Sequence, residues 1–366
     1  MAEKRKADTS FSSNDASGHL AKPIQLLDSH NGKDNSSRPT DSSVPLHTSL
    51  WTKAFIDRLG VRIVYEQSPE NIVKEWSLSV LSEKYLDDIE TMLPNVDSCL
   101  KHLDFDSLED ILIAIRSDRL PVDLLKIIKL NTDFQYPGSH FASFRARGED
   151  FLFTLLYIIN DIEEDVMDWQ YQILFDKFLK MFGFTVIQQP FMKTKKSQIM
   201  RTTVDSQSSL LCYTSDPRRQ RPVVVVCEVN NNEISDETAG NHSPSMKKQK
   251  SSVSINPILP HVISDSLMAK HVGELFLHFD ESVSPRAVLG MTVQRTVVHI
   301  TLLHAQEDTL QKIRNAGSEG CVFYDEQEKR ARFYYSKPLN YLKRDDRREL
   351  VRSLLHIILM QQRFEQ

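Results

Sequence analysis

Asp205, Glu228 and Asn230 carry side-chain oxygens and lie around the most apolar short run of this sequence, Val223–Cys227. A carboxylate that directly follows a buried strand is rare, because burial of an unpaired charge is costly. Side chains alternate along a strand, so Glu228 and Asn230 project from the same face. Carboxylate oxygens are the ligands that Mg²⁺ prefers, and bound Mg²⁺ can activate water for phosphodiester hydrolysis.

Two strands and a helix must position these side chains. The run Val223–Cys227 predicts a strand that is buried on both faces, and Ser208–Thr214 predicts the strand before it. A hairpin of these two strands would bring Asp205 close to Glu228. The next amphipathic stretch, Asp265–Phe279, predicts a helix.

This pattern resembles the core of the PD-(D/E)xK, or restriction-endonuclease-like, superfamily. In that family an Asp begins one strand, the next strand ends in Glu-x-Lys, and a helix then lies against the sheet. The resemblance implies that Asp205 and Glu228 hold a Mg²⁺ ion. Asn230 stands where the family has its catalytic lysine, and Lys270 of the predicted helix is the candidate for the displaced lysine that some members carry.

Each of these residues also has a structural interpretation. Glu228 can be a strand-end carboxylate paired with an arginine, and Lys270 can be an ordinary lysine on an exposed helix face. Some members of the superfamily carry another acid on the helix before the sheet, where this sequence has Glu164 and Asp168. Those acids can equally form a solvated face that complements a helix N-terminus.

A group of cations flanks the predicted site and could contact the phosphates of a nucleic acid. Its members are Lys193, Lys195, Lys196, Arg201, Arg218, Arg219 and Arg221. The alternative is that they are solvated loop residues. The formal net charge of the chain is −5, so contact with a nucleic acid would depend on such a local patch.

The length of 366 residues predicts about two folded regions. Polar composition predicts a disordered tail over residues 1–48 and a disordered insertion over 231–257. Helical periodicity predicts a small helical region over 49–135, and the resemblance implies that residues 150–366 form a restriction-endonuclease-like domain. The expected fold class is α+β or α/β, with this helical N-terminal region followed by a mixed sheet that helices flank.

Several sequence features bear on cofactors and location. The four cysteines show no CxxC spacing, which indicates reduced thiols and no zinc site. The sequence has no apolar run close to the 20 residues that a bilayer requires, so no membrane association is expected. Basic clusters at residues 4–6 and 247–250 favour the nucleus slightly over the cytoplasm.

Two classes of function follow from these patterns. The first is a nucleic-acid-associated protein with a PD-(D/E)xK-like domain, a degenerate nuclease or, if active, a metal-dependent phosphodiesterase. The second is a non-enzymatic adaptor that docks a protein partner through residues 49–135. Nucleotide-binding glycine motifs, HExxH and GxSxG are all absent, so no other catalytic class is indicated.

Overall fold

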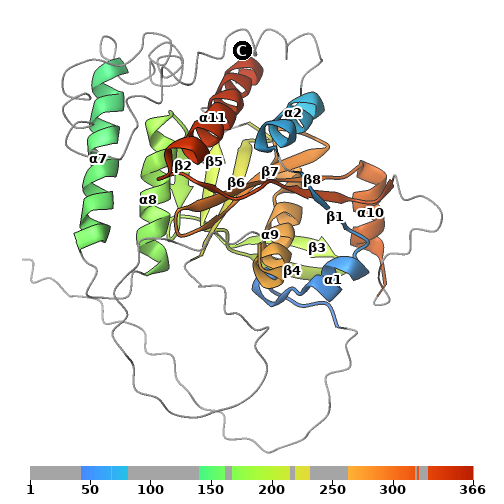
Figure 1. The fold of residues 1–366 in the computed structure, drawn as a ribbon. Helices are drawn as coiled ribbons and strands as arrows, with labels where there is room; N and C mark the ends of the chain where they lie inside the picture. The colour runs from blue at the N-terminus through green and yellow to red at the C-terminus, as the bar shows by residue number, and fades with distance from the viewer. Residues whose placement is uncertain are drawn as a thin grey trace, which may run out of the picture. The chain divides into compact units, whose positions relative to one another are not determined.

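One mixed sheet of eight strands organises the protein in the computed structural model (Figure 1). The structure describes residues 43–66, 68–80, 140–160, 167–214, 219–230, 263–317, 320 and 329–365. The strands in these ranges are β1 (Arg62–Tyr65), β2 (Thr185–Gln188), β3 (Lys195–Ile199), β4 (Thr202–Ser206), β5 (Leu210–Tyr213), β6 (Val223–Asn230), β7 (Ala287–Gln294), β8 (Val297–His304), β9 (Arg332–Tyr335) and β10 (Leu339–Asn340).

The large sheet has the strand order β1-β9-β8-β7-β6-β5-β2, and β10 pairs with β8 outside this path. The predicted hairpin is confirmed, since β5 and β6 pair antiparallel with Leu210 opposite Cys227. Strands β6 and β7 are parallel, and β7 and β8 are antiparallel. Strands β3 and β4 form a separate two-stranded sheet. The expected mixed sheet with flanking helices is therefore present.

Helices cover both faces of the large sheet (Figure 1). The helices of the described ranges are η1 (Thr48–Leu50), α1 (Lys53–Arg58), α2 (Pro69–Val80), α7 (His140–Asn160), α8 (Asp168–Met181), α9 (Asp265–Leu277), η3 (Phe279–Glu281), α10 (Glu307–Asn315) and α11 (Arg344–Glu365). Among these helices, none is long and apolar enough to cross a membrane.

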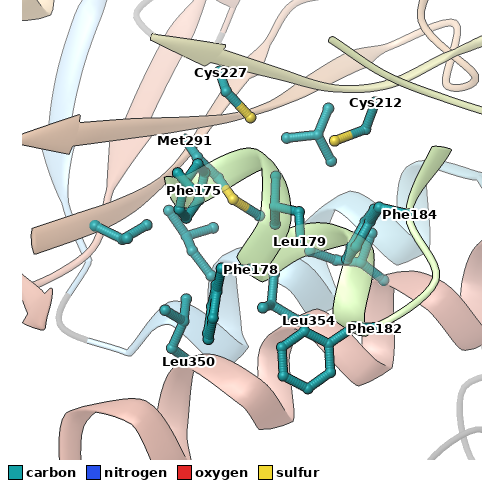
Figure 2. Close-up of a cluster of buried hydrophobic side chains, with 14 of the residues drawn as sticks. Phe175, Phe178, Leu179, Phe182, Phe184, Cys212, Cys227, Met291, Leu350 and Leu354 are labelled. Atoms are coloured by element: carbon teal, nitrogen blue, oxygen red, sulfur yellow. The ribbon is translucent and has the colours of Figure 1, made fainter. Parts of the chain in front are cut away.

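One face of the sheet packs against α2, α7, α8 and α11 through an apolar core. Figure 2 shows its centre, where Phe175 and Phe178 of α8 and Phe182, the residue after that helix, meet the strands and α11. Side chains alternate along β6, so Cys227 points into this core with its neighbours at every second position. Cys212 and Cys227 are both free and buried.

The other face packs against α1, α9, α10 and the β3–β4 hairpin. Helix α9 begins with a capping interaction, because the Ser264 hydroxyl accepts a hydrogen bond of 3.3 Å from the Leu267 N–H. Val226 of β6 points to this side. Glu228, two residues later, therefore faces α9 as well.

The N-terminal part of the fold differs from the sequence interpretation. Residues 49–80 contain strand β1 between α1 and α2, and β1 pairs in parallel with β9. These elements pack on the same sheet as residues 150–366. Residues 81–135 and the whole insertion 231–257 lie outside the described residues, as does the tail up to residue 42. Helix α7 begins at His140, ten residues before the expected start of the second folded region at residue 150.

Candidate functional site

Glu228 lies near the end of strand β6, and only 3% of the residue is exposed. Its two carboxylate oxygens have different partners. The Lys270 ammonium of α9 contacts Oε1, and the Ser209 hydroxyl donates a hydrogen bond of 2.9 Å to Oε2. The positively charged partner of this strand-end carboxylate is therefore a lysine, and the lysine comes from the helix that follows the strand.

Two glycines allow α9 to approach its neighbours closely. A Cβ atom at Gly290 of β7 would lie 2.5 Å from His271 Nε2, and a Cβ atom at Gly273 would lie 2.7 Å from Thr48 Cγ2. Larger residues would force these groups apart. The helix is thus held between η1 and β7, and this position sets Lys270 over the end of β6.

Glu274 lies one helical turn after Lys270, so both side chains project from the same side of α9. The Lys270 ammonium lies 3.9 Å from Glu274 Oε1, and the charge of Glu274 acts on the pKa of Glu228. Glu274 Oε2 lies 3.4 Å from His271 Nδ1. A single ammonium group therefore serves two buried carboxyl groups.

Burial governs the pKa values in this cluster. It raises the pKa of Glu228 to about 8, an effect that Glu274 increases and Lys270 opposes. Burial also raises the pKa of Glu274 to about 7, against the influence of Lys270. Burial alone would lower the pKa of Lys270, but the two glutamates outweigh it and raise that pKa. Near neutral pH the two carboxyl groups therefore retain at least one proton between them.

A row of polar side chains crosses the sheet beside Glu228. Glu228 pairs with Thr292 of β7, and Thr292 pairs with His299 of β8. His299 Nδ1 donates a hydrogen bond of 2.8 Å to the Ser336 carbonyl, and burial lowers the pKa of His299 to about 4, so the ring is neutral. Thr292 Oγ1 and His299 Nε2 are buried without a hydrogen-bond partner among the described residues.

The charge of Asp168, the first residue of α8, also acts on the cluster. Burial and the two glutamates influence the pKa of Lys270 more strongly, and the charge of Asp168 raises that pKa further. Asp168 was one of two acids expected on the helix before the sheet. The other, Glu164, lies outside the described residues.

Asp205 and Glu228, the two expected metal ligands, share no interaction within the described structure. Asp205 belongs to β4, where it pairs with Lys196 of β3, and its carboxylate lies 3.7 Å from His47 Nε2. The residue that meets Glu228 across the β5–β6 hairpin is Ser209. Strand β4 intervenes because the chain forms a separate hairpin before it enters β5, which the sequence interpretation did not anticipate.

Asn230 projects from the same strand face as Glu228 and is half-buried. Its backbone carbonyl accepts a hydrogen bond of 3.1 Å from the Arg295 N–H. An amide side chain cannot supply the charge of a lysine. Within the described residues, that charge reaches Glu228 from Lys270.

The expected phosphate-binding cations have different surroundings. Lys193 and Lys196 are exposed, whereas Lys195 forms an ion pair of 2.7 Å with Glu281. The Arg201 guanidinium donates a hydrogen bond of 2.9 Å to the Asn315 carbonyl. Arg219 and Arg221 are half-buried, with Arg221 Nη1 3.4 Å from the Ser284 carbonyl. Arg218 lies outside the described residues.

The donor set around Glu228 does not fit a magnesium ion as it stands. Both Glu228 oxygens already interact with Lys270 and Ser209, and a hydroxyl replaces the expected aspartate. Among the described residues, no group of three or more His, Cys, Asp or Glu side chains could hold a metal ion. Mg²⁺ prefers several oxygen ligands in near-octahedral geometry.

Sequence reasoning missed Ser209 and Glu274. The signal for Glu274 was its spacing of four residues from Lys270, which places both on one side of a helix. Ser209 gave no signal, because a serine before a strand is common. A scan of known protein families finds none that matches this chain, and a search of curated proteins finds no similar sequence.

Proposed function

We propose that this chain is a nucleic-acid-associated protein with a restriction-endonuclease-like domain whose nuclease site is degenerate. The observation that carries the proposal is the contact between the Lys270 ammonium and Glu228 at the end of β6. A lysine that reaches the strand-end glutamate from the following helix is the displaced lysine that the sequence resemblance implies. Asn230, at the usual lysine position, makes this displacement necessary.

The order of elements around Glu228 supports the proposal. Helix α8 precedes the antiparallel strands β2, β5 and β6, and the parallel strand β7 follows α9. Among the described elements, α9 is the next after the strand that bears the glutamate, and it lies against the sheet, as in the superfamily pattern. A fold alone does not define an activity, so the proposal depends on the side chains of the site.

The same side chains support degeneracy. Ser209 stands beside Glu228 where the family pattern would provide a second carboxylate, and a hydroxyl is a weaker ligand for Mg²⁺. Without a cation at the scissile phosphate, the transition state would lose several kcal/mol of stabilisation. We therefore expect binding of a nucleic acid without efficient cleavage.

The proposed contacts with phosphate are exposed lysines of the β3 segment, which comprises β3 and the two residues before it (193–199). Lys193 and Lys196 are both exposed, and Lys196 lies on β3 next to Asp205 of β4. Each lysine that contacts a phosphate contributes about one unit to the slope of log Kd against log salt concentration. The patch thus predicts binding that salt weakens and that depends little on sequence.

Fluorescence anisotropy with labelled single-stranded and duplex DNA and RNA tests the proposal. Lys193→Gln combined with Lys196→Gln should weaken binding and lower the salt slope by about two units. A matched double variant, Lys74→Gln with Lys177→Gln, changes the charge equally on α2 and α8 and should leave binding unchanged.

The outcomes separate association from catalysis. Absence of binding to all four nucleic acids at low salt would refute the proposed association. Cleavage of any of them in Mg²⁺ or Mn²⁺, if Glu228→Gln abolishes it, would refute degeneracy and leave the association intact. Equal effects of the two double variants would show that the β3 segment is not the binding surface.

A further inference from the structure

The Lys270 ammonium occupies a place that a metal ion could take. It contacts Glu228 Oε1 and lies 3.9 Å from Glu274 Oε1, so it stands between oxygens of two buried carboxyl groups. Glu228 is 3% exposed and Glu274 is completely buried. Two carboxyl groups in such a position require a cation or protons, because isolated buried charges are unstable.

We infer that Lys270 is a built-in replacement for a divalent cation, and that removal of its side chain opens a site for Mg²⁺ or Mn²⁺ between Glu228 and Glu274. The native protein then holds no divalent ion at Glu228. The inference concerns the same site as the proposed function, but it requires no nucleic acid.

A second observation indicates a ligand position at Glu274. Its Oε1 atom is buried and has no hydrogen-bond partner among the described residues, although the Lys270 ammonium is 3.9 Å away. An acceptor oxygen in this condition can take a metal ion directly. The Ser209 hydroxyl on the other side of Glu228 provides one further neutral oxygen.

The chemistry of these donors selects a hard divalent cation. All candidate ligands are oxygens, which Mg²⁺ and Mn²⁺ prefer over softer donors. His271 is held away from this role, because its Nε2 atom lies 2.8 Å from Thr301 Oγ1. Two carboxylates balance the charge of one divalent ion, just as one ionised carboxylate balances the ammonium of Lys270.

Titration of Mn²⁺ into the purified full chain tests the inference, with free Mn²⁺ measured by electron paramagnetic resonance at pH 8, where carboxyl ligands are more readily deprotonated. Lys270→Ala and the longer Lys270→Gln should both bind one Mn²⁺, at least about tenfold more tightly than the native protein. Adding Glu274→Gln to Lys270→Ala should abolish this gain.

Lys180→Ala is the matched control. Lys180 forms an ion pair of 2.8 Å with Asp176, which is about as buried as Glu228. Within the described residues, no second carboxyl group is paired with Lys180. This variant should gain no Mn²⁺ binding. A gain equal to that of Lys270→Ala would overturn the inference, since any unpaired buried acid would then suffice.

Thermal unfolding provides a second measure of Mn²⁺ binding, which remains usable if the Lys270 variants are less stable than the native protein. A cation that binds only the folded state raises the midpoint of unfolding with concentration. We expect Mn²⁺ to raise the midpoint of the Lys270 variants and not of the native protein. Two results would overturn the inference: Lys270 variants that neither bind nor respond to Mn²⁺, or native protein that binds Mn²⁺ and loses this binding in Glu228→Gln. Neither result depends on whether the protein binds a nucleic acid.

Discussion

The two faces of the large sheet bury different chemistry against different helices. On the side of α8 and α11, the centre of the core consists of aromatic and aliphatic side chains, with Phe178 packed against Tyr341 at a ring distance of 4.9 Å. The ionisable groups buried on α8 and α11, Asp176, Arg347 and His356, belong to the helices and not to the strands. On the side of α9, the end of the sheet buries ionisable groups from Glu228 to His299. The face covered by α8 and α11 therefore contributes mainly apolar burial, and the face covered by α9 carries the candidate site.

This difference follows from how each face gains free energy. Apolar burial is non-directional and does not depend on pH in the neutral range. A buried ionisable cluster gains little net free energy, and its value changes with protonation and with the loss of any single partner. Substitutions on the two faces should thus differ in size and in pH dependence.

The largest effect is expected for Phe178→Ala on the apolar face. Phe178 is completely buried and contacts the rings of Phe151, Phe182 and Tyr341. Its truncation leaves a cavity and should lower the free energy of unfolding by about 3–5 kcal/mol. Urea denaturation at pH 6 and at pH 8 should give the same loss.

Phe153→Ala is the control for this prediction, because Phe153 lies on α7 with 58% of the residue exposed. Its loss of stability should stay within about 0.5 kcal/mol. A Phe178→Ala loss that differed strongly between the two pH values would contradict the contrast between the faces.

The next effect is expected for Gly290→Ala, which tests how closely α9 must approach the sheet. The added Cβ atom would lie 2.5 Å from both His271 Nε2 and Thr301 Oγ1. Overpacking of this kind should lower the free energy of unfolding by about 1–3 kcal/mol. The same variant should displace Lys270 from Glu228, which a crystal structure would reveal. An unchanged stability would mean that α9 can shift without cost.

A smaller effect, counted per pH unit, is expected for the pH dependence of the α9 face. The pKa of Glu228 is raised from an ordinary 4.5 to about 8, and that of Glu274 to about 7. A raised carboxyl pKa means that the folded state keeps protons that the unfolded state releases. The stability gained from each retained proton is fully present below pH 4.5. It is lost as pH rises toward 7 for Glu274 and toward 8 for Glu228. Each such proton changes the free energy of unfolding by about 1.4 kcal/mol per pH unit.

Glu274→Gln isolates one of these protons. The amide resembles the protonated carboxyl group in shape, so the variant should lose less stability than the native protein as pH rises from 5 to 7. Denaturant midpoints across this range, with Asp150→Asn on the exposed surface as the control, provide the measurement. Parallel profiles for native protein and Glu274→Gln would show that Glu274 does not titrate in this window.

Much of the fold could be predicted from sequence, because local patterns determine it. The apolar run of β6, the strand before it and the amphipathic periodicity of α9 all led to elements that the structure contains. Strand β1 was missed, since it has only four residues and none of them is fully buried. Strands β3 and β4 were missed because their exposed lysines and threonines resemble a loop.

The candidate site was predictable only in part, since its members meet through tertiary packing. Glu228 and Lys270 were identified from their types and their places in the pattern, and the structure joins them. The expected approach of Asp205 assumed a hairpin that began too early in the chain. Glu274 depends on the rotation of α9 over the sheet, which the two close glycines control and which no local pattern encodes.

The smallest effect is expected for Lys195→Ala, at the solvent-facing margin of the α9 side. Lys195 forms an ion pair of 2.7 Å with Glu281, and both side chains are partly exposed. The pKa of Glu281 is lowered to about 2, most strongly by a hydrogen bond from His278 and also by the hydrogen bond and charge of Lys195. Solvent screens such pairs, so the loss of stability should remain below about 1 kcal/mol and shrink in 1 M salt.

A double-mutant cycle with Glu281→Gln measures this pair directly. A coupling free energy below about 1 kcal/mol would separate it from the Lys270 cluster, where removal of one partner leaves a buried charge. The pair stabilises the fold only while Glu281 is ionised, so its contribution should fade as pH drops from 4.5 toward 2. A coupling as large at the margin as at Lys270 would mean that burial is not what distinguishes the candidate site from the surface around it.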